Sequence, residues 1–267
     1  MPLSLLRSLR LRVTCALVVA TLLSACNVAP AGVQVYDPYE TTNRRVHEFN
    51  KGLDRTIIRP VAVTVARLPA DVTDPVVNFA DNTALPGMVV NGVLQGDIEG
   101  VASNTLRFLL NSTVGIGGLF DPADAIGLFE QSTDFGETLA VWGVPEGAYR
   151  ELPVRGPSTE RDAAGKIVDI FLDPLGSVLN SDQRAIVVGT RVGGTVINRG
   201  RFSNTVDSVL YDSADSYAQA HILYLQNRRF QLGQGATGTA ADPYGDTCAG
   251  GFEDPYADAA ADPCAAQ

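Results

Sequence analysis

Residues 91–124 read NGVLQGDIEG VASNTLRFLL NSTVGIGGLF DPAD, and this pattern predicts a helix followed by a tight apolar turn. Apolar and small residues recur at helical spacing, so they fall on one face of that helix. They are Ile98, Val101, Ala102, Thr105, Phe108 and Leu109. Asp97 stands where a capping residue is expected, because its side chain can accept hydrogen bonds from the first free N–H groups. We therefore expect a helix that begins after Asp97.

The second half of this stretch is apolar and rich in glycine. No charged residue occurs from Phe108 to Phe120. The run is too short to cross a bilayer, which takes about 20 residues of helix, but it is long enough to enter one leaflet and return. Its glycines let backbones approach closely, as in helices packed in lipid. The alternative interpretation is an ordinary core helix followed by a glycine-rich turn.

The first 26 residues have the pattern of a secretory signal that ends in a lipidation site. Three arginines precede an apolar run at 13–22, and Leu23-Ser24-Ala25-Cys26 resembles a bacterial lipobox. This pattern predicts removal of residues 1–25, lipidation of Cys26 and a lipidated tether at 26–36. Asn27 is not the aspartate that resembles an inner-membrane retention signal, so we expect an outer-membrane lipoprotein anchored in the periplasmic leaflet.

The charge and the cysteines exclude several classes of partner and site. Removal of the signal leaves 17 basic and 30 acidic residues, a formal net charge of −13. Nucleic acid is not an expected partner, because it is bound through basic patches. The two remaining cysteines, Cys248 and Cys264, could form a disulfide in an oxidising compartment, and the sequence leaves this open. Their spacing suits neither a zinc site nor a CxxC redox motif, so we expect no metal and no cofactor.

Proline and glycine divide the body of the chain. A helix beginning near Thr41 is expected to end before Pro60, because the residue before a proline avoids helical dihedrals. Residues 84–87 read as a turn, residues 147–157 as an irregular segment, and residues 158–162 as a helix start.

The C-terminal part contains one undecided segment and one clear helical pattern. Residues 184–198 combine β-branched residues with glycines, which leaves helix and strand open. Residues 207–229 predict a helix. Residues 233–267 are acidic, with little apolar content, and we expect this tail to be disordered.

The sequence offers little catalytic chemistry. It holds two histidines, His47 and His221, and neither lies in a HExxH motif. A GxSxG nucleophile motif is also missing from the sequence. Gly115-Ile116-Gly117-Gly118 lacks the lysine of a phosphate-binding loop. We therefore expect a protein that is not an enzyme.

Many short motifs, in order, resemble the VacJ/MlaA lipoproteins of the bacterial outer membrane. They include Asp37-Pro38-Tyr39-Glu40, Asn43-Arg44, Phe49-Asn50, Arg59-Pro60-Val61-Ala62, Leu94-Gln95-Gly96-Asp97, Asn111-Ser112-Thr113, Gly115-Ile116-Gly117-Gly118 with Asp121, and Gly156-Pro157-Ser158. The resemblance covers roughly residues 37–232. It departs from the family at 212–217, where the usual Asp-Pro-Tyr phrase is replaced, and in the cysteine-bearing tail.

The resemblance implies an all-α fold: a ring-like arrangement of amphipathic helices embedded in one leaflet, without a full transmembrane span. It implies that misplaced phospholipids leave the outer leaflet through a polar channel and reach a periplasmic lipid-carrier protein, which maintains lipid asymmetry. The implied partners are phospholipid, the outer-membrane bilayer, a trimeric porin and that carrier. The alternative is a non-transporting envelope lipoprotein that scaffolds porins or the cell wall.

Two sets of site residues follow from this likeness. Asn43, Arg44 and Asn50 are expected to line or approach the phospholipid path, because a headgroup needs a polar route through apolar surroundings. The membrane-embedded wall is expected to comprise Phe108, Leu109, Gly115, Ile116, Gly117, Gly118 and Phe120. The alternative for both sets is structural: asparagines as caps, Arg44 as a surface charge, and glycines for packing.

Overall fold

The computed structural model describes residues 35–233. Residues 35–224 form one compact unit and residues 225–233 belong to a second, with the boundary inside helix α12 (Ser216–Gln231). The expected signal peptide, Cys26, most of the tether, and the tail with Cys248 and Cys264 lie outside the described residues. Within 35–233, no helix is both long and apolar enough to cross a membrane.

The described chain is mainly helical, as expected. In order, its elements are α2 (Glu40–Leu53), the π-helical turn η1 (Asp54–Ile58), α3 (Arg59–Val65), α4 (Ala70–Gln95), α5 (Ile98–Thr113), α6 (Pro122–Ala125), α7 (Phe135–Val141), β1 (Tyr149–Leu152), β2 (Gly156–Thr159), α8 (Glu160–Leu172), α9 (Leu175–Val178), α10 (Ser181–Arg201), α11 (Ser203–Leu210) and α12. The expected cap at Asp97 and the helix start expected at 158–162 are both present, and Thr159 caps α8.

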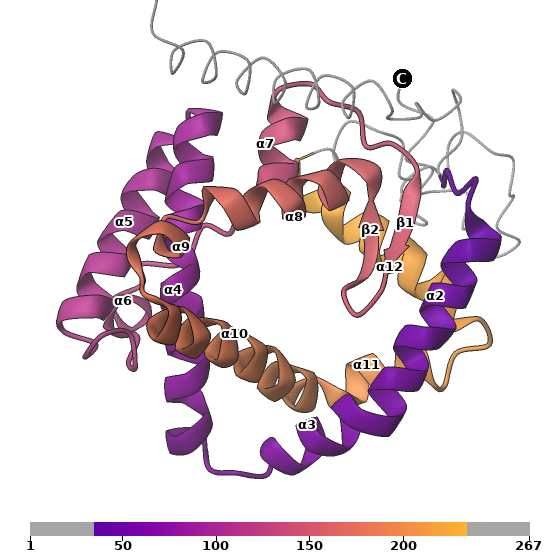
Figure 1. Cartoon of the computed structure of the whole chain (residues 1–267), viewed down its shortest axis with the longest axis horizontal. Helices are drawn as coiled ribbons and strands as arrows, with labels where there is room; N and C mark the ends of the chain where they lie inside the picture. Colours follow the sequence, from indigo (N-terminus) through magenta and orange to yellow (C-terminus); the bar gives the residue numbers. More distant parts are fainter. Residues whose placement is uncertain (1–34, 234–267) are drawn as a thin grey trace, which may run out of the picture. The chain divides into compact units, whose positions relative to one another are not determined.

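Within residues 35–224 the packed elements close a circuit (Figure 1). Helix α2 continues through η1 into α3, and α3 packs against α10. Helix α10 packs against α4, which contacts α7 and α8, and the β1–β2 hairpin joins α8 back to α2. Helix α5 packs on α4 outside this sequence of contacts. The ring-like arrangement of helices expected from the sequence is thus confirmed within this unit.

Residues 149–159, expected to be irregular up to Pro157, form an antiparallel hairpin. Tyr149 pairs with Thr159 and Leu152 with Gly156. The expectation of irregular structure was wrong because the pairing needs only four residues on each side and a glycine with φ of +77° at the turn. Short strands of this kind leave little periodicity in a sequence.

The two proline boundaries were also placed wrongly. The helical segment does not end before Pro60, because η1 passes directly into α3. Pro60 stands in the first turn of α3, where a missing N–H is tolerated. Residues 84–87 are not a turn, because α4 runs through Pro86. Arg191 of α10 donates to both the carbonyl and the hydroxyl of Thr83, one turn before Pro86, and so ties this part of α4 to α10.

The undecided segment at 184–198 is part of α10, and its glycines have a packing role. A Cβ at Gly194 would lie 3.2 Å from the Cβ of Ala80, and one at Gly200 would lie 2.2 Å from the carbonyl oxygen of Ala62. The missing side chains therefore let α10 approach α4 and α3 closely, an arrangement that offsets the low helix propensity of glycine. The helix expected at 207–229 is divided, because α11 ends at Leu210 and α12 begins at Ser216.

The turn η1 places an acid at the junction of three helices. Asp54 is buried and its carboxylate accepts two hydrogen bonds from Arg199, at 2.9 and 2.7 Å, and one from the hydroxyl of Tyr211 at 2.7 Å. Arg199 also contacts Asp207 at 2.7 Å, and Arg59 contacts the other oxygen of Asp207 at 2.6 Å. Burial and the bond to Asp54 raise the pKa of Tyr211 to about 12, so its hydroxyl remains a donor.

Candidate functional site

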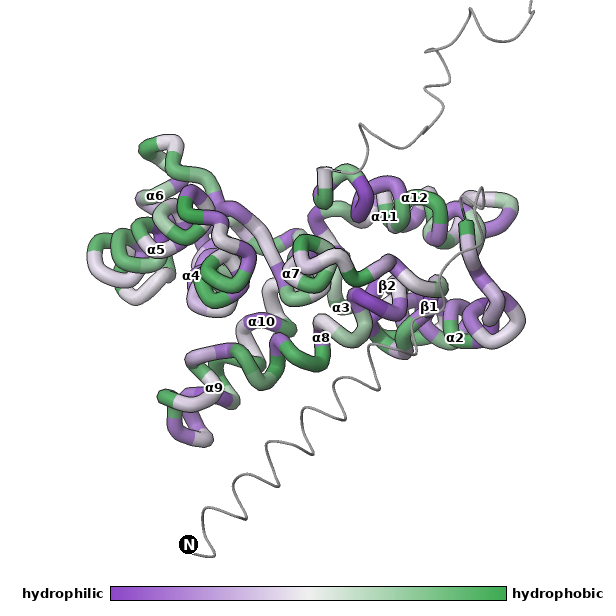
Figure 2. Tube along the Cα trace, turned by 90° about the horizontal axis from the view of Figure 1, so that it is seen from above, coloured by the Kyte–Doolittle hydropathy of each residue, from purple (hydrophilic) through white to green (hydrophobic). Residues whose placement is uncertain are grey.

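Helix α5 buries its polar face and exposes its apolar one. The buried residues are Gly100, Asn104, Arg107 and Asn111. By contrast, Ile98 is 83% exposed, Leu106 56% and Leu109 53%. The tube in Figure 2 alternates between hydrophobic and hydrophilic residues along α5, as an amphipathic helix requires. A helix in water turns its apolar stripe inward, so this inverted orientation indicates that the outer surface meets an apolar environment.

The polar face of α5 binds the segment that follows the glycine turn. Arg107 pairs with Asp121 at 2.6 Å and donates to the carbonyl of Leu128. Asn111 donates to Asp121 at 2.9 Å and accepts from the N–H of Ala123 at 3.1 Å. Asn104 makes a reciprocal pair of hydrogen bonds with the backbone of Gln131. These buried polar groups therefore fix residues 121–131 against α5 rather than forming an apolar core.

The turn after α5 brings the expected wall residues together. Ile116, Gly117 and Gly118 have φ of +55°, +72° and +92°, and the turn exposes Val114, Ile116, Leu119 and Phe120. Gly115 and Gly118 are buried, Leu109 is exposed and Phe108 is half-buried. The apolar side chains of the turn are thus exposed, whereas Gly115 and Gly118 lie inside it. Their role as a wall in the membrane stays a prediction.

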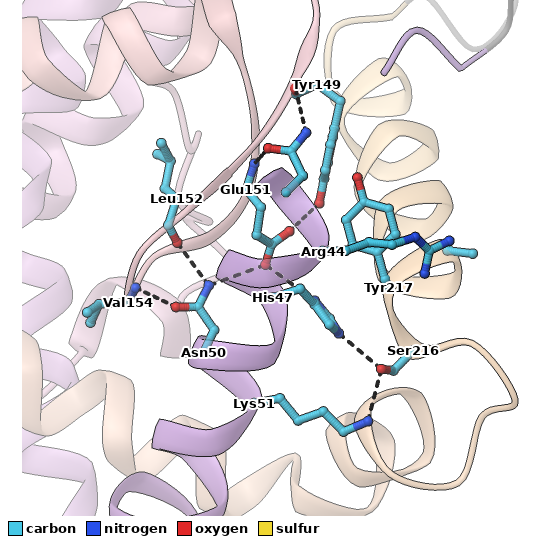
Figure 3. Close-up of polar contacts among 12 residues, drawn as sticks. Arg44, His47, Asn50, Lys51, Tyr149, Glu151, Leu152, Val154, Ser216 and Tyr217 are labelled. Atoms are coloured by element: carbon cyan, nitrogen blue, oxygen red, sulfur yellow. Dashed lines mark hydrogen bonds and ion pairs between the residues drawn. The ribbon is translucent and has the colours of Figure 1, made fainter. Parts of the chain in front are cut away.

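Two of the expected path residues, Asn43 and Asn50, bind the hairpin; Figure 3 shows the contacts of Asn50. Asn43 is 3% exposed; it donates to the carbonyl of Tyr149 at 3.1 Å and accepts from the N–H of Glu151 at 3.0 Å. Asn50 donates to the carbonyl of Leu152 at 2.9 Å and accepts from the N–H of Val154 at 2.7 Å. Both amides hold β1 against α2, and their part in a lipid path remains a prediction.

The third expected path residue, Arg44, lies on the exposed side of α2. Its guanidinium contacts Glu40 at 2.8 Å and Asp215 at 2.9 Å, and it lies 4.5 Å from the ring centroid of Tyr217. The structure therefore brings Asn43 and Asn50 to the hairpin and directs Arg44 toward the start of α12.

The Arg44–Asp215 pair gives a testable pH dependence. Hydrogen bonding to Arg44 lowers the pKa of Asp215 from 3.8 to about 2, so the pair stabilises the fold above about pH 4. This contribution is lost as pH falls through about 2. Because both side chains are more than 40% exposed, we expect Arg44→Gln to lower the free energy of unfolding by less than about 1 kcal/mol at pH 7.

The measurement is urea unfolding of both proteins at neutral pH and at several acidic values. The difference between wild type and Arg44→Gln should vanish toward pH 2. Arg45→Gln is the matched control, since Arg45 is exposed on the same helix and forms no ion pair within residues 35–233. A difference that persists unchanged at low pH would contradict the assignment.

A buried histidine in Figure 3 joins a serine to a carboxylate. His47 Nε2 lies 3.0 Å from the hydroxyl of Ser216, and its Nδ1 lies 3.4 Å from Glu151. This order matches that of a hydrolytic triad. However, Ser216 is only 6% exposed, and its oxygen accepts a hydrogen bond from Lys51 at 3.1 Å. The cluster therefore joins α2, β1 and the start of α12 rather than forming a site for substrate.

A cavity of about 280 Å³ lies among α4, α8, α10 and the hairpin turn. Its charged lining residues are Arg155, Lys166, Asp169, Asp173 and Arg191, with Asn91 and Thr133 as neutral polar neighbours. A second cavity, of about 310 Å³, is lined by Arg55, Arg59, Asp207, Tyr211 and Asp212. Sequence reasoning missed the charged residues of the first cavity because they come from three separate segments, at 155, 166–173 and 191, and no single motif contains them.

The first cavity suits a polar or charged group rather than a metal ion. Within residues 35–233, no group of three or more potential metal ligands occurs among the histidines, cysteines and acids. Asn91 at the cavity is 2% exposed, donates to Asp169 at 2.9 Å and accepts from Thr138 at 3.0 Å. Hydrogen bonds among its own side chains thus fix part of the polar lining of this cavity.

A family model described as "MlaA lipoprotein" matches residues 35–231. The chain belongs to the MlaA lipoprotein family. The matched residues include every helix and both strands of the described structure, together with the first cavity. Membership of the MlaA family confirms the resemblance that the short motifs indicated.

Several curated proteins are similar to the chain. The Intermembrane phospholipid transport system lipoprotein MlaA of Escherichia coli is 33% identical over 229 residues, 83% of this chain and 89% of that protein. The protein of the same name from Haemophilus influenzae is 26% identical over 204 residues, 74% of this chain and 80% of that protein. An uncharacterized protein of Rickettsia typhi is 41% identical over 145 residues, 54% of this chain. The chain spans 58% of the length of that Rickettsia relative.

A solved structure supports the fold. It is described in the words "Structural basis for maintenance of bacterial outer membrane lipid asymmetry". The match has a TM-score of 0.64 at 33% identity and covers 73% of this chain and 98% of the other. The relatives named as MlaA are transport lipoproteins, in agreement with the scarcity of catalytic motifs in the sequence.

Proposed function

We propose that this protein removes misplaced phospholipids from the outer leaflet of the outer membrane and passes them through a polar channel to a periplasmic carrier. This activity maintains lipid asymmetry. Membership of the MlaA family and the names of the curated relatives support the proposal. In this proposal the anchor is the lipid on Cys26, and a trimeric porin is the membrane partner.

The observation that carries the proposal is the inverted orientation of α5. Its outward face bears Ile98, Leu106 and Leu109, and the turn after it adds exposed apolar side chains. Such a surface is unfavourable in water, because burying apolar area contributes about 25 cal/mol per Å². A single leaflet would cover this surface, and no described helix needs to cross the bilayer.

The cavity among α4, α8 and α10 supplies the polar part of the path. A phospholipid has a charged headgroup and two apolar chains, so it needs a polar lining next to an apolar exterior. Asp169, Arg191 and Lys166 provide charges at the cavity. Apolar side chains of α8 remain exposed nearby along the chain, including Ile167, which is 60% exposed, and Phe171, which is 82% exposed. In this proposal the headgroup occupies the cavity and the acyl chains lie along apolar surface.

Filling the cavity tests the function. Gly87 lines it, and a Cβ at Gly87 would meet no atom within 4 Å, so Gly87→Trp can place a ring there without an immediate clash. We expect this variant, expressed in a strain lacking its own family member, to lose about 90% or more of phospholipid clearance, because the ring would block the headgroup route. Surface phospholipid measured by lipid A acylation and by extraction of outer leaflets is the readout.

The matched control is Gly189→Trp. Gly189 also lies in a helix with no atom within 4 Å of a built Cβ, but it is exposed and does not line the cavity. We expect it to keep clearance near the wild-type level. Full phospholipid clearance by Gly87→Trp would show that the cavity is not part of the lipid path. Normal surface phospholipid in a strain without the protein would instead favour the scaffolding alternative.

A further inference from the structure

The turn of the β1–β2 hairpin is held in place by one side chain of α2. Val154 has a φ of +69°, which is unfavourable for a β-branched residue. Its N–H donates to Asn50 Oδ1 at 2.7 Å, while Asn50 Nδ2 donates to the carbonyl of Leu152 at 2.9 Å (Figure 3). The same amide therefore binds both sides of the turn. This contact fixes the backbone of the residue that follows, Arg155, which lines the first cavity.

The carboxylates of this cavity are already occupied by donors from the protein. Asp173 accepts from Arg191 at 2.8 Å and from the N–H of Leu175 at 3.0 Å. Asp169 accepts from Asn91 at 2.9 Å and from the N–H of Phe135 at 3.2 Å. Each carboxylate thus already accepts from two groups of the protein, and an incoming ammonium would have to share the same oxygens with these donors.

The three cations of the cavity differ in whether another residue of the protein already binds them. Arg191 is engaged by Asp173 and Thr83, and Lys166 donates to Ser158 at 3.1 Å. Arg155 is exposed and forms neither a hydrogen bond nor an ion pair with another residue of the described chain. With three cations and two carboxylates, the lining has a net charge of +1, and the available charge is positive.

We propose that Arg155 binds the phosphodiester of the transported lipid and makes the cavity prefer headgroups of net charge −1 over zwitterionic ones. This inference rests on the proposed function. A guanidinium binds phosphate oxygens through two parallel hydrogen bonds, which are charge-assisted. An anionic headgroup such as phosphoglycerol needs only that contact. A phosphoethanolamine headgroup also brings an ammonium, for which the cavity holds no unoccupied acceptor carboxylate. Asn50 is a positioning residue, because it acts through the turn.

The test uses the full lipoprotein in a maltoside detergent. Dihexanoylphosphatidylglycerol and dihexanoylphosphatidylethanolamine are titrated separately and followed by calorimetry. We expect the wild type to bind the glycerol lipid about tenfold more tightly. Arg155→Gln removes the phosphate contact for both lipids, but it also takes the net charge of the lining from +1 to 0, which relieves the repulsion of an ammonium. It should therefore weaken the glycerol lipid more than the ethanolamine lipid and remove most of this preference. Asn50→Ala should reduce the same ratio, whereas a purely structural role would weaken both lipids equally.

Control experiments separate the headgroup preference from the proposed phospholipid transport on which it rests. Arg45→Gln removes an exposed cation of α2 that does not line the cavity, so it should leave the ratio unchanged. Displacement of the glycerol lipid by an equal concentration of inorganic phosphate would indicate a free-anion site and overturn the inference. Equal binding of the two lipids, or a preference that survives Arg155→Gln, would overturn the inference alone. If neither lipid binds, the inference also fails, and the surface-phospholipid assay then decides whether the proposed function fails with it.

Discussion

Replacing Asp54 by alanine is expected to lower the free energy of unfolding by about 3–5 kcal/mol, the largest single loss that we predict. Asp54 and Arg199 have side chains that are 10% and 9% exposed, so the ion pair lies almost entirely out of water. Removing the carboxylate leaves a buried guanidinium with only Asp207 as its acid partner, and it also strips an acceptor from the hydroxyl of Tyr211. Breaking one half of a buried pair costs more than the pair contributes, because the remaining charge stays desolvated.

The measurement is urea unfolding followed by far-ultraviolet circular dichroism. Glu48→Ala is the matched control, because Glu48 is an exposed acid of the neighbouring helix, and we expect a change within about 0.5 kcal/mol. A double variant, Asp54→Leu with Arg199→Leu, should recover part of the loss, since two apolar residues can replace a buried pair at little cost. A loss below about 1 kcal/mol in Asp54→Ala would show that the pair does not hold η1 and α10 together.

Gly115→Ala is expected to lower the free energy of unfolding by about 3 kcal/mol, near the upper end for overpacking. A Cβ at Gly115 would lie 2.4 Å from the carbonyl oxygens of Asn111 and Phe120, and neither atom is the flexible end of a side chain. The backbone of the turn would therefore have to move. That movement would also displace the apolar residues expected to form the wall, so phospholipid clearance should fall with stability.

The matched control for this prediction is Gly117→Ala, two residues further along the same turn. A Cβ at Gly117 would meet no atom within 4 Å, and the cost comes from its φ of +72° alone, about 1–2 kcal/mol. The difference between the two variants gives the cost of the steric clash at Gly115. It is measured by urea unfolding of both variants, together with surface-phospholipid assays. Equal losses in the two variants would mean that backbone conformation, rather than close packing, makes the turn depend on glycine.

The sequence by itself determined the class of the fold, the cap of α5, the start of α8 and the family. It did so because amphipathic periodicity, capping residues and ordered motifs are local or ordered along the chain. The helical repeat of Ile98, Phe108 and Leu109 predicted α5, and Asp97 predicted its start. The same repeat could not say which face lies inside. That depends on Arg107, Asn104 and Asn111 finding partners at 121–131, which only folding brings within hydrogen-bonding distance.

Only the tertiary structure decided the positions of the candidate site residues. Asn43 and Asn50 were expected in the lipid path because they are polar and lie in family motifs, and their part in it stays a prediction. Only the structure shows that their amides bind the hairpin about 100 residues away. The cavity draws Arg155, Asp169 and Arg191 from segments that share no motif. Pro60 looked like a helix end and residues 84–87 like a turn, but η1 leads directly into α3 at Pro60, and α4 runs through Pro86. The hairpin contacts of Asn43 and Asn50 and the lining of the cavity join residues that are distant in the chain, so a pattern of neighbouring residues does not contain them.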